Sequence, residues 1–125
     1  MLKEKYQKVL DLGQKLQVQD GYVEEQGGKL RIGGTAEYAY DKDRLWDMIK
    51  EQPGWESEIE ADIKVKNQDV YGVYEVVGGD TLSKISKKLF GSANRYMEIF
   101  EKNRDILKDP NLIKVGQKLK LPMPS

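Results

Sequence analysis

Carboxylates are the side chains of this sequence with the clearest capacity for acid–base chemistry. The 125 residues include 21 Asp and Glu but no Cys and no His, which removes disulfides, thiolate nucleophiles and the commonest general base. No Ser/Lys nucleophile set and no phosphate-binding loop stands out. A pair such as Asp80 and Asp109 could hydrolyse a glycosidic bond. However, a capping role explains Asp80, and Asp109 precedes a proline in a turn. We therefore predict that the protein is not an enzyme.

The stretch YEVVGGDTLSKI, residues 74–85, joins a β-like run to a helical pattern through two glycines. Gly78 and Gly79 free the backbone at the turn. Asp80 stands where its carboxylate could accept hydrogen bonds from the first amides of the helix. The junction is therefore predicted to be a folding device first, with Asp80 as the cap, and a ligand loop second.

Four acidic residues, Glu56, Glu58, Glu60 and Asp62, alternate along one face of a predicted strand. Such carboxylates could bind a cation, but the solvated face of an amphipathic strand is the favoured explanation for them. A potassium ion would be bound more readily by backbone carbonyls, which leave no trace in side-chain identity. The sequence therefore neither places a potassium site nor excludes one.

The overall charge gives no support to nucleic-acid binding, because 21 Lys and Arg balance the 21 acidic residues. Lys84, Lys87 and Lys88 indicate a solvated helix face. No apolar run is long enough to span a bilayer, and the first residues do not resemble a secretory signal. We therefore expect no transmembrane segment and a cytoplasmic protein.

The first half of the chain has the pattern of a small α+β unit. A helix is expected at about 2–17, then strands at 22–26 and 29–36 joined by a glycine hairpin. Gly33-Gly34 indicates a bulge or a close backbone approach. A second helix is capped by Asp41, and a clear period-two strand at 59–65 follows it.

The second half begins after a short polar linker at 67–72. Its pattern predicts a strand at 73–77, helices at 81–89 and 93–102, and a last strand at 117–121. The expected fold class is thus α+β, in two small units with the orders αββαβ and βααβ.

The second half resembles the LysM domain over about residues 73–122. The resemblance is carried by Tyr74, Val76, Gly79-Asp80-Thr81-Leu82 and Ile85, then by Phe90-Gly91, Ile99-Phe100, Asn103, Leu112-Ile113, Gly116-Gln117 and Leu121-Pro122. Two positions depart from the family pattern: Tyr96, where tryptophan is frequent, and Ser86, where alanine is frequent. The family has a βααβ fold, which agrees with the predicted elements.

The LysM resemblance implies binding of N-acetylglucosamine polymers such as peptidoglycan in a shallow groove between two loops. Small residues there would let the backbone reach the acetamido groups of the sugar while apolar side chains cover the sugar face. The implied glycan-binding residues are Gly79, Asp80, Thr81 and Leu82 in one loop, and Asp109, Pro110, Asn111, Leu112 and Ile113 in the other.

The first half resembles the BON domain through its element order, Gly28-Lys29-Leu30 with Ile32 and Gly34, Arg44-Leu45, and Pro53-Gly54. A BON unit followed by a LysM unit is similar to the small bacterial LysM/BON proteins, some of which are described as potassium-binding. The predicted organisation is a BON-like domain at 1–66, a linker at 67–72 and a LysM domain at 73–122. The expected function is non-catalytic glycan binding, with a cytoplasmic potassium-responsive protein as the alternative and with no cofactor other than K⁺.

Overall fold

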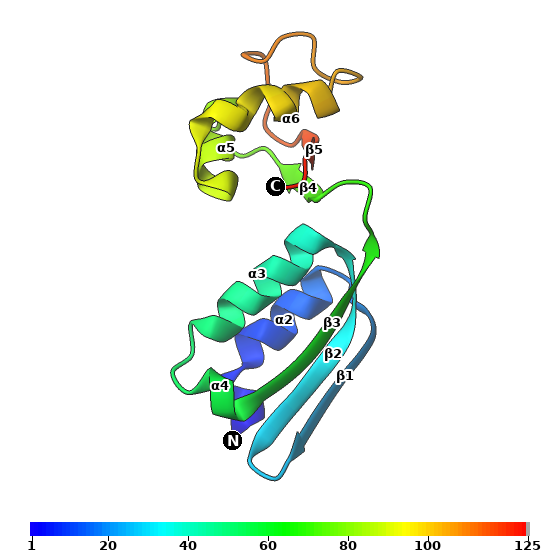
Figure 1. Cartoon of the computed structure of the whole chain (residues 1–125), viewed down its shortest axis with the longest axis vertical. Helices are drawn as coiled ribbons and strands as arrows, with labels where there is room; N and C mark the ends of the chain where they lie inside the picture. The colour runs from blue at the N-terminus through cyan, green and yellow to red at the C-terminus, as the bar shows by residue number, and fades with distance from the viewer. Residues whose placement is uncertain (125) are drawn as a thin grey trace. The chain divides into compact units, whose positions relative to one another are not determined.

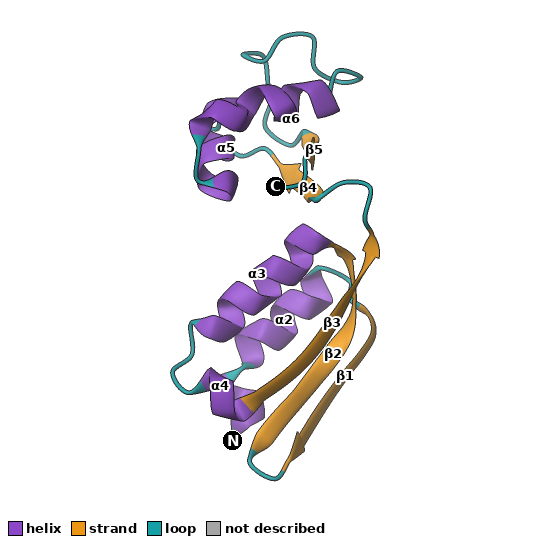
Figure 2. Ribbon diagram, in the orientation of Figure 1, coloured by secondary structure: helices purple, strands orange, loops and turns teal. Residues whose placement is uncertain are grey.

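The computed structural model describes residues 1–124, which form two compact units, one from Met1 to Gln68 and the other from Asp69 onwards (Figure 1). Both units combine helices with a small sheet (Figure 2), which confirms the α+β class. The division between Gln68 and Asp69 lies inside the predicted linker. None of the helices within residues 1–124 is long and apolar enough to cross a membrane.

The first unit packs helices against one face of a three-stranded sheet (Figure 1). Its elements are α1 (Leu2–Lys5), α2 (Gln7–Lys15), β1 (Gln19–Gln26), β2 (Lys29–Tyr38), α3 (Ala39–Lys50), α4 (Trp55–Glu58) and β3 (Ile59–Asn67). The strand order is β1-β2-β3, with β1 antiparallel and β3 parallel to β2. The predicted order is confirmed, with α4 as an addition that the sequence pattern did not indicate.

Alternation along β2 and β3 decides which face of the sheet is buried. Leu30, Ile32, Ile59 and Ile63 are each no more than 8% exposed, whereas the alternate residues Arg31, Glu60 and Asp62 are exposed. The helices contribute a matching apolar stripe. The buried cluster consists of Tyr6, Val9, Leu30, Ile32, Ala36, Leu45, Ile49, Ile59 and Ile63.

Glycines shape the sheet at two places. Gly27 and Gly28 have φ of +62° and +78°, as a type I′ hairpin requires, which confirms the predicted hairpin. Gly34 has φ +149°, and a Cβ there would lie 2.6 Å from a methyl carbon of Val18. The predicted close approach of the backbone at Gly34 is therefore confirmed. The irregularity in strand register lies instead on the neighbouring strand β1, between Gln19 and Tyr22.

Two sequence-based assignments in the first unit are wrong. Asp41 does not cap its helix: α3 begins directly after β2, with Tyr38 as the N-cap residue, so Asp41 falls in the first turn and is buried. Burial raises the pKa of the Asp41 carboxyl, against the attraction of Arg44. The acidic row is also interrupted, because Glu56 and Glu58 belong to α4 rather than to the strand.

The second unit has the order β-α-α-β. Its elements are β4 (Gly72–Glu75), α5 (Leu82–Phe90), the 3₁₀ turn η1 (Ala93–Arg95), α6 (Tyr96–Lys102) and β5 (Lys118–Leu121). β4 and β5 pair antiparallel, and α5 and α6 contribute Leu82, Ile85, Ile99 and Phe100 to the apolar core. This confirms the predicted βααβ arrangement.

A buried amide fixes the last strand of this unit. Asn103 is 1% exposed, and its side chain bonds both backbone groups of Lys120, accepting from the amide at 2.7 Å and donating to the carbonyl at 2.9 Å. The same Nδ2 donates to the carbonyl of Ile99 at 2.7 Å.

Ser86, the second departure from the family pattern, is fully buried and donates its hydroxyl hydrogen to the carbonyl of Ser92.

Tyr6 anchors the start of the first unit. Its ring is fully buried, and its hydroxyl donates to a carboxylate oxygen of Glu58 at 2.9 Å. Lys5 binds the same oxygen at 2.5 Å. Burial, and then the hydrogen bond to Glu58, raises the pKa of Tyr6 to about 12.

We predict a loss of stability at high pH that depends on Tyr6. Since the pKa is raised from 10.0 to about 12 on folding, the stabilisation is complete below pH 10 and is lost as the pH rises towards 12. The loss attributable to Tyr6 should be on the order of 2 kcal/mol. It can be measured by urea unfolding of the first unit, followed by the fluorescence of Trp46 and Trp55. Tyr6→Phe should show a shallower decline over this pH range, and an equal decline in both proteins would contradict the prediction.

Candidate functional site

The predicted ligand loops lie in the second unit, and a backbone contact joins them. Val76, just after β4, donates its amide to the carbonyl of Gln117 at 2.9 Å and accepts from the amide of Gly116 at 2.8 Å. The first loop, residues 77–81, therefore leaves β4 beside the turn that leads into β5. Val76, Gly116 and Gln117 belong to the sequence pattern, but their role in joining the loops was not predicted.

The first loop is a tight turn. The amide of Asp80 donates to the carbonyl of Val77 at 3.1 Å, and Gly79 has φ +86°, the arrangement of a type II turn. Gly79 thus occupies the position of the turn that requires a positive φ. A Cβ at Gly78 or Gly79 would meet no atom within 4 Å, so the backbone of the loop is open to a ligand.

Asp80 stabilises this turn and does not cap the helix. Its Oδ2 accepts from the Val77 amide at 2.9 Å and from the Tyr74 hydroxyl at 2.8 Å. Thr81 is the N-cap residue instead, and its Oγ1 accepts from the amide of Lys84 at 3.1 Å. The prediction of Asp80 as cap is wrong because the helix starts one residue later, at Leu82. The Asp80 carboxylate instead accepts hydrogen bonds within the turn that precedes the helix.

The electrostatics of Asp80 match a structural carboxylate. The hydrogen bond from Val77 lowers its pKa, with smaller contributions from Tyr74 and from nearby Lys88 and Lys84. A glycosidase acid needs the opposite shift, towards a raised pKa. Asp80 is thus held ionised and already hydrogen-bonded, which argues against catalysis.

The second loop is built from two consecutive turns. Asp109 accepts from the amide of Asn111 at 2.8 Å through its side chain and from the amide of Leu112 at 3.1 Å through its carbonyl. Further on, the Gln117 side chain accepts from the amide of Lys114 at 2.8 Å, and Gly116 has φ +90°. Both carboxylates considered for catalysis are therefore engaged in holding a loop.

Exposure separates the predicted glycan-binding residues into two groups. Gly79, Thr81, Asn111 and Leu112 are exposed, and Asp80, Asp109, Pro110 and Ile113 are partly buried. Leu82 is only 2% exposed, so its side chain belongs to the core and only its backbone could reach a ligand. Three apolar side chains of the two loops lie open to solvent: Val77 at 51%, Leu112 at 67% and Val115 at 72%.

The other residues considered for a site are not brought together for chemistry. Within residues 1–124, no group of three or more acidic side chains is arranged to hold a metal ion. Glu58 is engaged by Lys5 and Tyr6, while Glu60 lies 3.4 Å from both Lys29 and Arg31.

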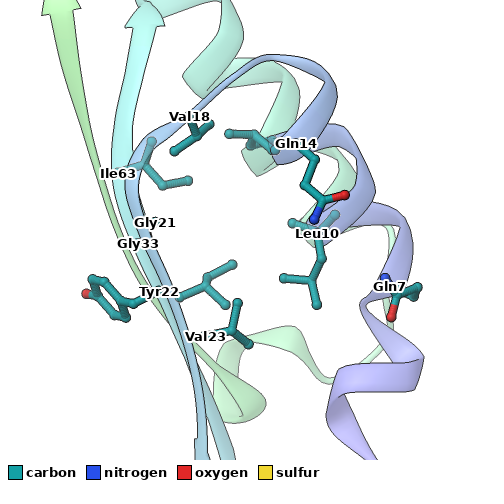
Figure 3. Close-up of a pocket in the computed structure, with 13 residues that line it drawn as sticks. Gln7, Leu10, Gln14, Val18, Gly21, Tyr22, Val23, Gly33 and Ile63 are labelled. Atoms are coloured by element: carbon teal, nitrogen blue, oxygen red, sulfur yellow. The ribbon is translucent and has the colours of Figure 1, made fainter.

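A pocket of about 350 Å³ opens in the first unit between α2 and the strands (Figure 3). Leu10 and Val23 line it from opposite sides, and Gln7 and Gln14 provide amide groups on the helix side. No charged side chain lines it. It therefore offers neither an acid–base pair nor a metal site.

Capping by Thr81 can be tested directly. Thr81→Ala should lower the free energy of unfolding of the second unit by about 1 kcal/mol, because the Lys84 amide loses its acceptor. Thr81→Ser retains the hydroxyl and should be close to the parent. Urea unfolding followed by circular dichroism, together with hydrogen exchange at the Lys84 amide, would measure the effect. Unchanged protection of that amide in Thr81→Ala would refute the capping role.

Comparison with known proteins identifies the second unit and leaves the first unassigned. Residues 74–122 match the family model of the LysM domain. The chain is also similar to the "Potassium binding protein Kbp" of Escherichia coli O6:H1 (strain CFT073), with 53% identity over 49 residues. This match covers 39% of the chain and 33% of that relative, so the chain spans about a third of the curated protein it matches.

The BON-like character of the first unit stays a prediction, since the family match lies in the second unit. LysM is a binding module rather than a catalytic one, in agreement with the engaged carboxylates of the two loops. Residues 74–122 therefore carry a LysM domain.

Proposed function

We propose that the protein is a non-catalytic glycan-binding protein whose LysM domain binds N-acetylglucosamine-containing polymer such as peptidoglycan. The observation that carries the proposal is the junction at Val76, which holds the two family loops side by side through two backbone hydrogen bonds. The site is then the exposed surface of residues 77–81 and 109–117.

The unused backbone of the first loop supports this proposal. Within the described residues, no hydrogen bond uses the amides of Gly78 and Gly79, and neither glycine has side-chain atoms to shield them. An acetamido group presents one donor and one acceptor, which such a backbone can match. Specificity would then depend on loop conformation rather than on side-chain identity.

The exposed apolar residues of the loops supply the second half of a sugar site. Val77, Leu112 and Val115 present aliphatic surface beside polar backbone, a combination typical of ligand sites. The groove implied by the family resemblance is shallow, so modest affinity per sugar chain is expected.

The proposal predicts that bulk at either loop abolishes binding to purified peptidoglycan. Asn111→Arg and Gly78→Arg place a long side chain on the exposed loops without removing the Thr81 cap or any hydrogen bond of Asp80. Each should weaken the affinity for insoluble peptidoglycan, measured by cosedimentation over a range of polymer concentrations, by about tenfold or more, which is on the order of 1.4 kcal/mol.

Met97→Arg is the matched control, since it adds the same charge to an exposed position on α6. It should sediment like the parent. Loss of binding in the control, or parental binding in both loop variants, would show that the loops are not the glycan site.

A second candidate function is potassium binding, which the name of the matched relative suggests. Backbone carbonyls would have to provide the ligands, because the acidic side chains of residues 1–124 form no cluster for a metal.

Potassium binding predicts an ion-specific gain in stability. Adding KCl should raise the melting temperature more than NaCl at equal ionic strength, because an ion that binds only the folded state stabilises it. Trp46 and Trp55, whose rings lie 5.9 Å apart in the first unit, report by fluorescence whether that unit takes part. Identical melting curves and emission spectra in both salts would exclude specific potassium binding.

A further inference from the structure

The two edges of the sheet in the first unit differ in a way that concerns assembly. Within residues 1–68, β1 and β3 each pair on one side only, so each leaves a row of backbone groups without a strand partner. Natural sheets usually protect such edges with bulges, short strands or repelling charges.

The β1 edge carries these protections. Its register shifts between Gln19 and Tyr22, and Asp20 has φ +54°. The charges of the strand are all acidic: Asp20, Glu24 and Glu25. A second copy of β1 would therefore meet an irregular backbone and like charge.

The β3 edge is regular over its length. Residues 59–67 pair with β2 without a register shift and contain neither glycine nor proline. The face of β3 away from the helices carries four exposed charges in the order Glu60, Asp62, Lys64, Lys66. Along this face, every second residue is charged, and two acidic residues are followed by two basic ones.

This order is self-complementary when two copies of β3 run antiparallel. If Ile63 lies opposite Ile63 of a second copy, Asp62 faces Lys64 and Glu60 faces Lys66, each twice by symmetry. Directly opposite side chains in an antiparallel pair lie about 4.5–5.5 Å apart at Cβ, close enough for opposite charges to attract. On the other face, Ala61 lies opposite Val65, so apolar residues also meet apolar residues.

Neighbouring registers lack this match. A shift that keeps the same faces together centres the pair on Asp62 opposite Asp62 or on Lys64 opposite Lys64, and like charges directly opposite are destabilising. Within residues 1–124, Asp62, Lys64 and Lys66 form no ion pair, whereas Glu60 already lies 3.4 Å from Lys29. The central pair of Asp62 with Lys64 is therefore the most informative to alter.

We propose that the β3 edge is a docking surface for a second copy of this chain, forming an antiparallel, two-fold symmetric dimer centred on Ile63. Pairing would join two three-stranded sheets into one of six strands, with the helices of the two first units on the same face. The dimer would carry two LysM domains, which would increase retention on a polymer through avidity. That consequence rests on the proposed glycan binding, whereas the dimer does not.

Sedimentation equilibrium of the full chain, without glycan, tests the dimer by charge exchange. The parent should shift from 14.4 kDa towards twice that mass as the concentration rises. Asp62→Lys places Lys opposite Lys64, and Lys64→Asp places Asp opposite Asp62, so each variant alone should associate at least about tenfold more weakly. An equimolar mixture of the two variants restores every opposite-charge pair and should dimerise at least as well as the parent.

Two results would overturn the proposal. One is a parent protein that stays monomeric at concentrations up to about 1 mM, since a dimer with a dissociation constant above that value would be too weak to support the proposal. The other is a parent dimer that both single variants leave unchanged. The positions are exposed, so the variants should keep the parental circular dichroism spectrum.

The register of the dimer can be tested independently by disulfide formation, because the native chain has no cysteine. When Asp62→Cys is mixed with Lys64→Cys, a disulfide should form between the two variants. Neither variant alone should form a disulfide between two copies of itself.

Discussion

The two backbone hydrogen bonds of Val76 are the constraint on which the proposed binding surface depends. By pairing with Gly116 and Gln117, this residue extends the contact between β4 and β5 beyond the strands and sets both loops at one end of the small sheet. Asn103 supports the same arrangement, because its side chain binds both backbone groups of Lys120 and so fixes β5. The positions of the loops therefore follow from backbone pairing, and the side chains of Asp80, Asp109 and Gln117 then hold the loops in shape through hydrogen bonds.

The sequence predicted the elements well where burial has a simple period. Ile59, Ala61, Ile63 and Val65 alternate without interruption, and β3 is found where that pattern lies. It failed where backbone geometry decides between neighbouring residues. Asp80 and Thr81 are both good caps by residue type, and only the turn closed by Val77 and Asp80 determines which one reaches the helix amides.

The site was predictable as a pair of loops but not as a surface. Gly79 and Asn111 could be assigned through the family pattern, and both are exposed. Leu82 belongs to the same pattern, yet it points into the core because it starts the apolar stripe of α5. The contributions of Val77 and Val115 depend on exposure, which a lone apolar residue in a loop does not reveal. Carbonyl ligands for potassium are harder still to predict from sequence, since the backbone of any residue can supply them.

Mapping a sugar onto individual amides is the measurement that tests the central claim most directly. In a titration of the ¹⁵N-labelled chain with a soluble N-acetylglucosamine oligomer, the account predicts that the largest chemical-shift changes fall on the amides of residues 77–81 and 109–117. The amides of Gly78 and Gly79 should be among them, because their backbone is open in the free protein. Changes confined to residues 1–68, or none at saturating sugar, would contradict it.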